Sequence, residues 1–591
     1  MDGTLQVMRP DAERILPASG LLEIRSRYTQ GKRLSMKMFE TTDEITGGMS
    51  VALALQAMDV TTVFTIPSAH NMTILRSIED LGTIRVVGCR HEQGVLHSAD
   101  AYARVIGGLG VAIVSGGPGT ANTMGGLYEA HHASSPVLLI TSQVETGHLG
   151  RGRGYVHEAE HQSEMLRTAS KETVTVESVD DIATTVLRLG RAARSGRPRP
   201  TCVEIPLDLQ DAVIGDPHAL DCLDTDIRPL VRKAPDTVSI DEAVALLSQA
   251  HAPIIWAGGG VVRSDAVAAL KLFAERWDAP VITSREGRGA ISELDPRSLG
   301  GYATLPPMRE FLDTCDVMLA VGTRFQMYPT AQWNLKLPPT VVHLDIDPTM
   351  IGLNYPAAAS VIADAAAGLD SLTKSMPSTV DAPTRAAHLE AGRDAAAAAR
   401  ELVARQAGTD HLAISEIITR LRPTDGALVC DATVPAYVWG DRLVPVTDAG
   451  TSVRSTAAGI GPGMAMAVGA ALAADQHTVL LQGDGGFMLG VAELATAVQS
   501  SAKVIVCLFD DHGYGMLRGI QSTIGDGSHH HVDLTTPDFT ALASAFGAPA
   551  RRVSDVGQFE SAFTEALGHD GPTLIHVEMA ALAPLQRNLG T

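Results

Sequence analysis

The chain has 591 residues, of which 45% are hydrophobic and 19% are charged, and its formal net charge at pH 7 is −21. A chain of this length can form several domains, each with its own core. The net charge argues against a nucleic-acid-binding surface, because neutralising phosphates requires clustered Lys and Arg. We therefore expect a large soluble protein without a nucleic-acid partner.

The six cysteines lack the Cys-x-x-Cys spacing of metal sites, and several lie in apolar, strand-like runs. We expect them to be reduced core thiols. The sequence also lacks a basic segment followed by an apolar export signal, and it has no apolar run of membrane length. These features predict a cytoplasmic protein that does not enter a membrane.

Residues 1–43 have mixed charge and weak periodicity, and we interpret them as an N-terminal extension of unknown role. Three α/β domains are expected to follow, over residues 44–215, 236–380 and 408–585. A stretch rich in Pro and Asp near residues 216–235 separates the first two domains, and an Ala-rich, helical linker near residues 384–407 separates the last two.

In the first domain, an apolar run over residues 84–89 predicts a strand, and residues 95–104 have helical composition. Glu92 lies between them and therefore opens a helix. Taken alone, such a glutamate is explained by its favourable interaction with the helix macrodipole. A second strand, predicted over residues 111–115, ends in a glycine-rich turn that permits close approach of the backbone.

Two features downstream of this turn have both a functional and a plain interpretation. His131 and His132 can shuttle protons, or they are helix-end histidines packed on the sheet. Arg151 and Arg153 can grip a substrate carboxylate or a nucleotide phosphate, or they belong to a solvated basic loop.

The central domain contains three predicted strands, over residues 253–257, 317–321 and 341–345, with a glycine run after the first. This pattern indicates a nucleotide-binding fold, although Gly258-Gly-Gly260 is not a Gly-x-Gly-x-x-Gly fingerprint. Asp345 and Asp347 are equally well explained as helix caps and as ribose ligands.

The third domain carries the most informative pattern. Residues 478–482 and 503–509 are predicted strands, and residues 491–500 between them have helical composition, which is the pattern of a βαβ unit. A crossover of this kind makes the strands parallel, so the acidic turns after them lie at their carboxyl ends, where open α/β sheets bind ligands. Asp484 and Asp511, 27 positions apart, are therefore expected to converge.

Carboxylate oxygens suit Mg²⁺ or Ca²⁺, and the flanking glycines let backbone amides approach a phosphate. The sequence thus predicts a site for a metal-bound diphosphate; the alternative is an ordinary βα turn beside an acidic loop. His529-His-His531 is interpreted as part of a solvated loop rather than as a metal site.

Two motifs together resemble those of the thiamine-diphosphate-dependent enzyme superfamily, in its acetolactate synthase-like and 2-oxoacid decarboxylase group. They are Gly483-Asp-Gly485, followed after 24 residues by Asp510-Asp511, and the segment Arg90-His-Glu-Gln93. The resemblance extends over roughly residues 44 to 580. The family usually has Asn-Asn at the acidic pair, so this chain places more negative charge beside the diphosphate.

The resemblance implies a fold of three consecutive doubly wound parallel-sheet domains: pyrimidine-binding, central nucleotide-fold and diphosphate-binding. It also implies roles for particular residues. Glu92 is the catalytic glutamate, which stabilises the imino tautomer of the aminopyrimidine so that the cofactor can form its ylide. Asp484, Asp511 and the carbonyl group of Gly513 are expected to hold Mg²⁺.

The remaining cofactor contacts follow from the same resemblance. Gly483, Gly485 and Gly486 are expected beside the diphosphate, and Ile460 is expected to wedge the cofactor into a V shape; alternatively, Ile460 is a core residue. Tyr514, Met516, Leu517 and Gln521 either line the substrate side or form an amphipathic helix packed on the sheet.

The implied activity is that of a thiamine-diphosphate- and Mg²⁺-dependent carboligase or decarboxylase acting on a 2-oxo acid. We favour the carboligase because the overall resemblance is to synthase-like chains and because Lys171 falls where synthases carry a lysine. The alternatives are a simple decarboxylase, a flavin-dependent oxidase and a non-catalytic cofactor-binding homologue. The central domain holds FAD in synthases, ADP in some lyases and no ligand in many decarboxylases. The family also implies a homodimer or homotetramer, in which two copies complete each site.

Overall fold

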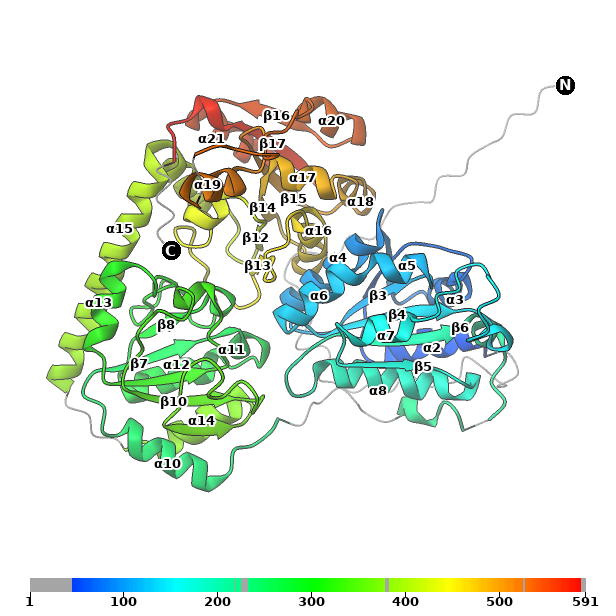
Figure 1. Cartoon of the computed structure of the whole chain (residues 1–591), viewed down its shortest axis with the longest axis horizontal. Helices are drawn as coiled ribbons and strands as arrows, with labels where there is room; N and C mark the ends of the chain where they lie inside the picture. Colours follow the sequence, from blue (N-terminus) through cyan, green and yellow to red (C-terminus); the bar gives the residue numbers. More distant parts are fainter. Residues whose placement is uncertain (1–44, 217, 225–231, 378–381, 525–526, 586–591) are drawn as a thin grey trace. The chain divides into compact units, whose positions relative to one another are not determined.

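The computed structural model describes residues 45–216, 218–224, 232–377, 382–524 and 527–585, and these residues form one compact unit. The predicted extension, residues 1–43, lies outside the described residues. Three parallel β-sheets flanked by helices make up this unit (Figure 1). The prediction of an α/β fold with three parallel sheets is confirmed, whereas the domain boundaries remain predictions.

The first sheet has the order β2-β1-β3-β4-β6-β5. Its strands are β1 (Thr62–Thr65), β2 (Arg85–Gly88), β3 (Gly110–Val114), β4 (Val137–Gln143), β5 (Glu172–Thr175) and β6 (Thr201–Pro206). Its helices are α2 (Gly47–Ala57), α3 (Met72–Leu81), α4 (Glu92–Ile106), α5 (Pro118–Asn122), α6 (Met124–Ala133), α7 (Gln162–Arg167), α8 (Ile182–Arg194) and α9 (Leu207–Asp211). Helices α2, α3 and α8 pack in one apolar core and α4 and α6 in another, so both faces of the sheet are covered.

The central sheet has the order β11-β10-β9-β7-β8. Its strands are β7 (Pro253–Ala257), β8 (Val281–Thr283), β9 (Val317–Val321), β10 (Thr340–Asp345) and β11 (Ala359–Ile362). Its helices are α10 (Thr237–Leu247), α11 (Gly259–Arg263), α12 (Val267–Trp277), α13 (Pro306–Thr314) and α14 (Ala365–Ser375). One face packs on α10, α12 and α14, and the other shares a core with the third sheet.

The third sheet has the order β13-β12-β14-β15-β17-β16. Its strands are β12 (Leu428–Cys430), β13 (Ser452–Arg454), β14 (Thr478–Gly483), β15 (Val504–Asp510), β16 (Ala550–Val553) and β17 (Thr573–Glu578). Its helices are α16 (Gly463–Ala474), α17 (Asp484–Gly490), α18 (Glu493–Ser500), α19 (Gly515–Ile524), α20 (Phe539–Phe546) and α21 (Val556–Ala566).

The predicted linker near residues 384–407 is helical, but it is more than a spacer. Helix α15 runs over Ala382–Leu421 with a break at Gly408, where φ is +73°. Its residues Ala399, Val403 and Ile414 are fully buried in the core shared by the central and third sheets. The helix therefore joins these two sheets by packing.

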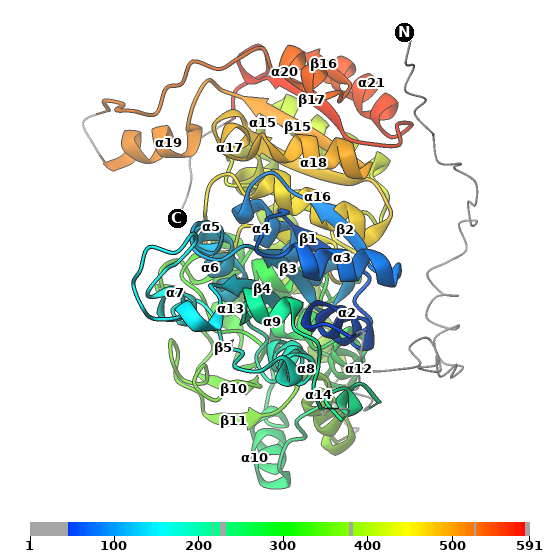
Figure 2. The ribbon, with the colours of Figure 1, turned by 90° about the vertical axis from the view of Figure 1, so that its right-hand side faces the viewer.

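The first and third sheets meet through helices α4 and α16 (Figure 2). Gly469 allows this contact, because a Cβ atom there would lie 2.0 Å from the carbonyl oxygen of Ser98. The Ser98 hydroxyl donates a hydrogen bond of 2.9 Å to the carbonyl oxygen of Ala465. The helix that begins with Glu92 is thus anchored on the third domain.

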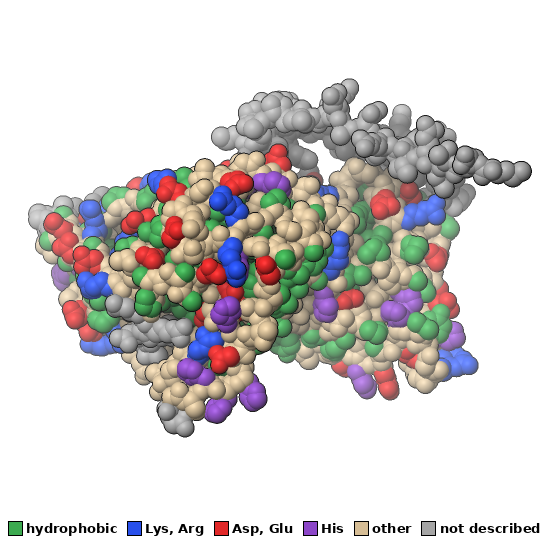
Figure 3. Space-filling view, turned by 90° about the horizontal axis from the view of Figure 1, so that it is seen from above, with side chains coloured by type: hydrophobic (Ala, Val, Ile, Leu, Met, Phe, Trp, Pro, Cys, Tyr) green, Lys and Arg blue, Asp and Glu red, His purple; other side chains and the backbone are tan. Residues whose placement is uncertain are grey.

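On the face seen in Figure 3, acidic and basic side chains are interspersed. Among the helices of the described residues, none is long and apolar enough to cross a membrane. The six cysteines are free thiols, and all except the half-buried Cys222 are buried, as the sequence predicts.

Candidate functional site

The pairing of β14 with β15 brings the acidic residues of the third domain together. The strands are parallel, and Gly483, the last residue of β14, lies beside Phe509. Asp484 therefore begins α17 at the same sheet edge at which β15 ends in Asp510. The sequence predicted this convergence but not α17, which occupies a stretch that we expected to be a turn.

Asp484 is buried, and its carboxylate accepts a hydrogen bond of 2.7 Å from the backbone amide of Gly513. Burial, followed by the negative charges of Asp511 and Asp510, raises the pKa of Asp484 to about 7. A cation bound at this position would offset both the energetic cost of burying the charged carboxylate and its repulsion by the neighbouring aspartates.

The two residues of the acidic pair have different surroundings. Asp510 is buried and accepts hydrogen bonds from the backbone amide of His512, at 3.0 Å, and from His576 Nε2, at 2.9 Å. Burial raises the pKa of Asp510, but these hydrogen bonds outweigh it and lower the value. Asp511 instead forms an ion pair of 3.3 Å with Arg518 of α19.

The residues of this edge fit a metal-bound diphosphate. A Cβ atom on Gly485 would lie 2.7 Å from the ring of Tyr514, and one on Gly486 would lie 2.8 Å from Gln482 Nε2, so only glycine leaves the turn open. The carbonyl oxygen of Gly513 lies 3.4 Å from the same Gly485 position. The buried Gln482 Oε1 has no hydrogen-bond partner within the described residues.

The donor set also indicates which metal would bind. Across the described ranges, no group of three or more His, Cys, Asp or Glu side chains is arranged to hold a metal ion. A cation at Asp484 and Asp511 would therefore complete its shell with backbone oxygen, water and phosphate oxygens. That combination is typical of Mg²⁺.

Ile460 lies in a kinked segment beside this turn. Ala458 has φ +60° and Gly461 has φ +99°. The Cγ2 atom of Ile460 lies 3.5 Å from the position of a Cβ on Gly486. Ile460 is half-buried and belongs to none of the described core clusters, so its side chain is available to a ligand, and the core interpretation loses support.

Asp431 is a site residue that the sequence analysis missed. It follows β12, is buried, and accepts hydrogen bonds from Gln482 and from the backbone amide of Gly461, the latter at 3.1 Å. Burial raises the pKa of Asp431 to about 6. Its position directly after an apolar strand is the signal that identified Asp484, so the sequence could have revealed it.

Glu92 lies at the start of α4, at the carboxyl edge of the first sheet. Its Oε2 atom accepts a hydrogen bond of 3.0 Å from Asn122 of α5, and its Oε1 atom lies 3.4 Å from the position of a Cβ on Gly119. His91 caps the helix by accepting the amide of Gln93 at 3.1 Å. In the described part of the chain, the polar contact of Glu92 is thus with its own domain, not with the diphosphate site.

A buried glutamate of the third domain fixes the turn that carries Glu92. Glu493 Oε1 accepts hydrogen bonds from the backbone amides of Arg90, at 3.1 Å, and His91, at 3.0 Å. Gly94 makes room for it, because a Cβ atom there would lie 2.2 Å from the same oxygen. No local sequence signal marks Glu493, because its partners lie some 400 residues away.

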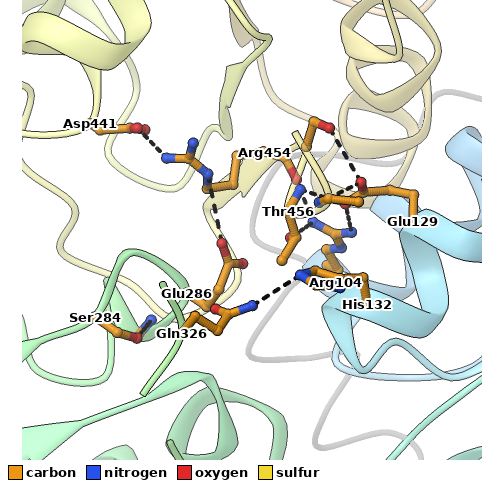
Figure 4. A network of polar contacts seen from close by, with 12 residues as sticks. Arg104, Glu129, His132, Ser284, Glu286, Gln326, Asp441, Arg454 and Thr456 are labelled. Atoms are coloured by element: carbon orange, nitrogen blue, oxygen red, sulfur yellow. Dashed lines mark hydrogen bonds and ion pairs between the residues drawn. The ribbon is translucent and has the colours of Figure 1, made fainter. Parts of the chain in front are cut away.

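A second buried glutamate belongs to the first domain and binds a segment of the third domain. Glu129 of α6 accepts the backbone amides of Thr456, at 2.6 Å, and Ala457, at 2.9 Å, and forms an ion pair of 3.0 Å with Arg104 (Figure 4). Burial raises the pKa of Glu129, but Arg104 and these amides outweigh it and lower the value. The first domain therefore holds the segment that leads to Ile460.

A pocket of about 470 Å³ lies between the first and central domains. Its lining includes the arginines Arg104, Arg194, Arg197, Arg232, Arg263 and Arg324 and the acids Asp265, Glu286, Asp345 and Asp364. Burial and neighbouring arginines lower the pKa values of Arg263 and Arg324 to about 10. Positive charge therefore accumulates in this pocket, which suits an anionic ligand.

The residues predicted for the central domain differ in their positions relative to this pocket. Gly258 serves packing, because a Cβ atom there would lie 2.2 Å from the carbonyl oxygen of Gly322. Asp345 faces the pocket, and burial raises its pKa to about 6. Asp347 instead bonds to Arg197 at 3.4 Å and caps a turn through the amide of Thr349 at 3.0 Å.

Other predicted features lie away from the diphosphate site. His131 and His132 end α6; His131 contacts the carbonyl oxygen of Ala169, and His132 lines the pocket, where burial and Arg324 lower its pKa to about 4. Lys171 donates hydrogen bonds to three carbonyl groups at and after the end of α8, those of Ala192, Ser195 and Arg197. It therefore has a structural role at the end of α8, and the inference of a carboligase from its position stays a prediction.

The two predicted loops are exposed. In the 149–158 loop, Glu158 accepts the amides of Gly152, at 2.9 Å, and Tyr155, at 3.0 Å, and Arg151 and Arg153 remain exposed. The His529–His531 segment is also exposed, as expected of a solvated loop.

Helix α19 does not pack on the sheet over its length, since Met516 is the one apolar residue of its first turn that contacts the core. Leu517, Ile520 and Ile524 are 39%, 42% and 81% exposed. The apolar face of α19 is therefore uncovered in the single chain.

Comparisons with known proteins identify the family of the chain. Three thiamine pyrophosphate enzyme sequence models match: the N-terminal TPP-binding domain over residues 45–165, the central domain over 240–372 and the C-terminal TPP-binding domain over 435–577. The chain is 32% identical to a probable 2-ketoarginine decarboxylase of Pseudomonas aeruginosa, covering 91% of this chain and 94% of that protein.

It is also 30% identical to the acetolactate synthase isozyme 2 large subunit of Escherichia coli, covering 91% of this chain and 96% of that protein. The structure of a thiamine diphosphate-dependent 4-hydroxybenzoylformate decarboxylase of Rhodococcus jostii aligns with a TM-score of 0.75 at 22% identity, covering 90% of this chain and 99% of that one. The chain therefore belongs to the thiamine pyrophosphate enzyme family, in the group of acetolactate synthases and 2-oxoacid decarboxylases.

Proposed function

We propose that this thiamine diphosphate-dependent carboligase or decarboxylase uses Mg²⁺ held by Asp484, Asp511 and the carbonyl group of Gly513, and acts on a 2-oxo acid. The observation that carries the proposal is the convergence of the buried Asp484 carboxylate with the loop after β15, over glycines that leave the turn open. Bound thiamine diphosphate would supply a nucleophilic carbon and an electron sink for loss of carbon dioxide.

The residues of the chain have separate tasks in this proposal. Glu92 holds a proton at the aminopyrimidine ring, and Asn122 orients its carboxylate. Ile460 shapes the bound cofactor from its half-buried position beside Gly486. The exposed Arg151 and Arg153 are available for the substrate carboxylate. Relatives on both the synthase and the decarboxylase side match the chain, so product analysis decides between ligation and protonation.

A homo-oligomer completes the site in this proposal. Glu92 contacts Asn122 in its own chain, and the apolar residues Met488 and Leu489 of α17 are exposed, as is the apolar face of α19. A second copy whose first domain covered α17 and α19 would bury these side chains and bring its Glu92 to the cofactor. Both gains favour a symmetric dimer.

The pocket between the first and central domains is proposed to hold a nucleotide with a diphosphate group, either FAD or ADP. Its arginines would bind the phosphates, and its volume of about 470 Å³ lies in the range of cofactor sites. Asp345, which ends β10 and lines the pocket, would accept a hydrogen bond from a ribose hydroxyl group.

Replacing the catalytic glutamate tests the mechanism. Glu92→Gln should lower turnover of 2-oxo acids about 10²- to 10⁴-fold, because an amide cannot hold the proton. Thermal unfolding should be unchanged, since Glu493, not Glu92, holds the turn. The matched control is Glu164→Gln, which changes an exposed glutamate of α7 and should retain full turnover. Full turnover by Glu92→Gln would contradict the assignment.

The affinity of the apo protein for Mg²⁺ and thiamine diphosphate should depend on pH. Because the pKa of Asp484 is raised to about 7, its carboxylate is protonated below that pH and must lose a proton to bind the metal. Affinity measured by calorimetry should fall about tenfold for each pH unit below 7. Asp484→Asn should bind weakly at every pH; an unchanged affinity between pH 5 and 8 in the wild type would contradict the prediction.

The pocket proposal predicts that a nucleotide accompanies the purified protein. Heat denaturation should release FAD, which is yellow, or ADP, and chromatography identifies either one. Arg263→Gln and Arg324→Gln should each reduce the amount released, because each removes a pocket cation. Arg188→Gln, which changes an exposed arginine paired with Glu172, should leave it unchanged. A wild-type protein that neither carries nor binds either nucleotide would contradict the proposal.

A further inference from the structure

Arg518 of α19 organises the loop that follows β15. Its guanidinium group contacts the Asp511 carboxylate at 3.3 Å and donates to the carbonyl oxygens of Asp511, at 3.4 Å, and His512, at 3.3 Å. It also binds Asp533 at 2.8 Å. The Arg518 side chain is only 14% exposed, although three of the four residues of its first helical turn are not buried. One cation thus joins the backbone and the carboxylate of the loop that is proposed to hold the metal.

Two glycines allow this arrangement. A Cβ atom on Gly513 would lie 2.6 Å from an Arg518 nitrogen, and one on Gly515 would lie 1.9 Å from an oxygen of the Asp511 carboxylate. Any side chain at either position would displace the guanidinium group or the carboxylate. The local sequence is therefore suited to a close approach of Arg518 to Asp511.

The net charge of the metal site explains why a cation beside Asp511 would favour diphosphate binding. With Asp484 and Asp511 as ligands, two negative charges cancel those of Mg²⁺ before the diphosphate arrives, whereas an asparagine in place of Asp511 would leave one positive charge. Asp510 adds a third carboxylate, but it is bonded to His576 and to the amide of His512. Arg518 forms an ion pair with Asp511.

We propose that Arg518 is a positioning residue for the metal-bound diphosphate: it offsets the charge of Asp511 and fixes the Asp511–Gly513 loop. The inference rests on the proposed function, because it concerns the same metal site. It predicts that replacing Arg518 weakens diphosphate binding strongly when residue 511 is an aspartate and much less when residue 511 is an asparagine.

A double-mutant cycle on the full-length apo protein tests this dependence. Calorimetry measures the Kd of thiamine diphosphate, with Mg²⁺ present, for the wild type, Arg518→Gln, Asp511→Asn and the double variant. Arg518→Gln should raise Kd about tenfold or more in the wild-type background and about threefold or less in the Asp511→Asn background. Thermal unfolding of each apo variant establishes that it is folded.

Three controls separate positioning from a general structural role. Arg518→Lys keeps the charge and should retain most of the affinity. Arg518→Met, which removes the charge, replaces Arg518→Gln in the cycle if that variant does not fold. Asp533→Asn removes the other, exposed carboxylate partner of Arg518 and should change Kd less than about twofold. Binding of thiamine, which lacks phosphates, should be unaffected by Arg518→Gln.

The outcomes are distinguishable. An equal effect of Arg518→Gln in both backgrounds, or an equal effect on thiamine and thiamine diphosphate, would overturn the inference alone. Absence of Mg²⁺-dependent binding by the wild type would overturn the proposed metal site and the inference with it. A coupling confined to the background that retains Asp511 and to the diphosphate ligand is the result expected.

Discussion

The parallel pairing of β14 with β15 is the constraint on which the candidate site depends. Its register places Gly483 beside Phe509, so Asp484 and the Asp510–Asp511 pair leave the sheet at the same edge. Burial and the repulsion from the carboxylates of Asp511 and Asp510 together raise the pKa of Asp484 to about 7. The sheet thus creates an electrostatic cost that a metal-bound diphosphate would relieve, while Arg518 and His576 offset part of it.

Two buried glutamates connect this site to the first domain. Glu493 reaches from the third domain to the amides that begin α4, and Glu129 reaches from the first domain to the segment that leads to Ile460. A buried carboxylate is stable only when such donors satisfy it, so each glutamate fixes the segment that it binds. Within one chain, the turn carrying Glu92 and the segment carrying Ile460 are therefore positioned by the opposite domain. The pocket shares Arg104 with the second of these contacts, so it lies beside the same network (Figure 4).

The sequence was sufficient where the pattern is local. Strands β7 and β9 have the predicted bounds, and the turns at Glu92 and Asp484 lie at carboxyl ends of parallel strands as expected. It was insufficient for α17, which begins with Asp484-Gly-Gly. Glycine has a low helix propensity, so this helix depends on the packing around it rather than on its own sequence. The sequence also did not predict the partners of Glu493, Glu129 and Arg518. These contacts either join residues that are distant in sequence or depend on the geometry of a loop. The hydrogen bond of Lys171 to the end of α8 was likewise not predicted from the match of its position with synthases.

The central claim is that Glu92 of one copy activates the cofactor held at Asp484 of another. Co-expression of Glu92→Gln chains with Asp484→Asn chains tests it directly, because neither parent oligomer contains an intact site. The account predicts that a random mixture regains about a quarter of wild-type activity, since half the dimers are mixed and each carries one intact site. Mixed dimers that form and yet stay as inactive as both parents would contradict it.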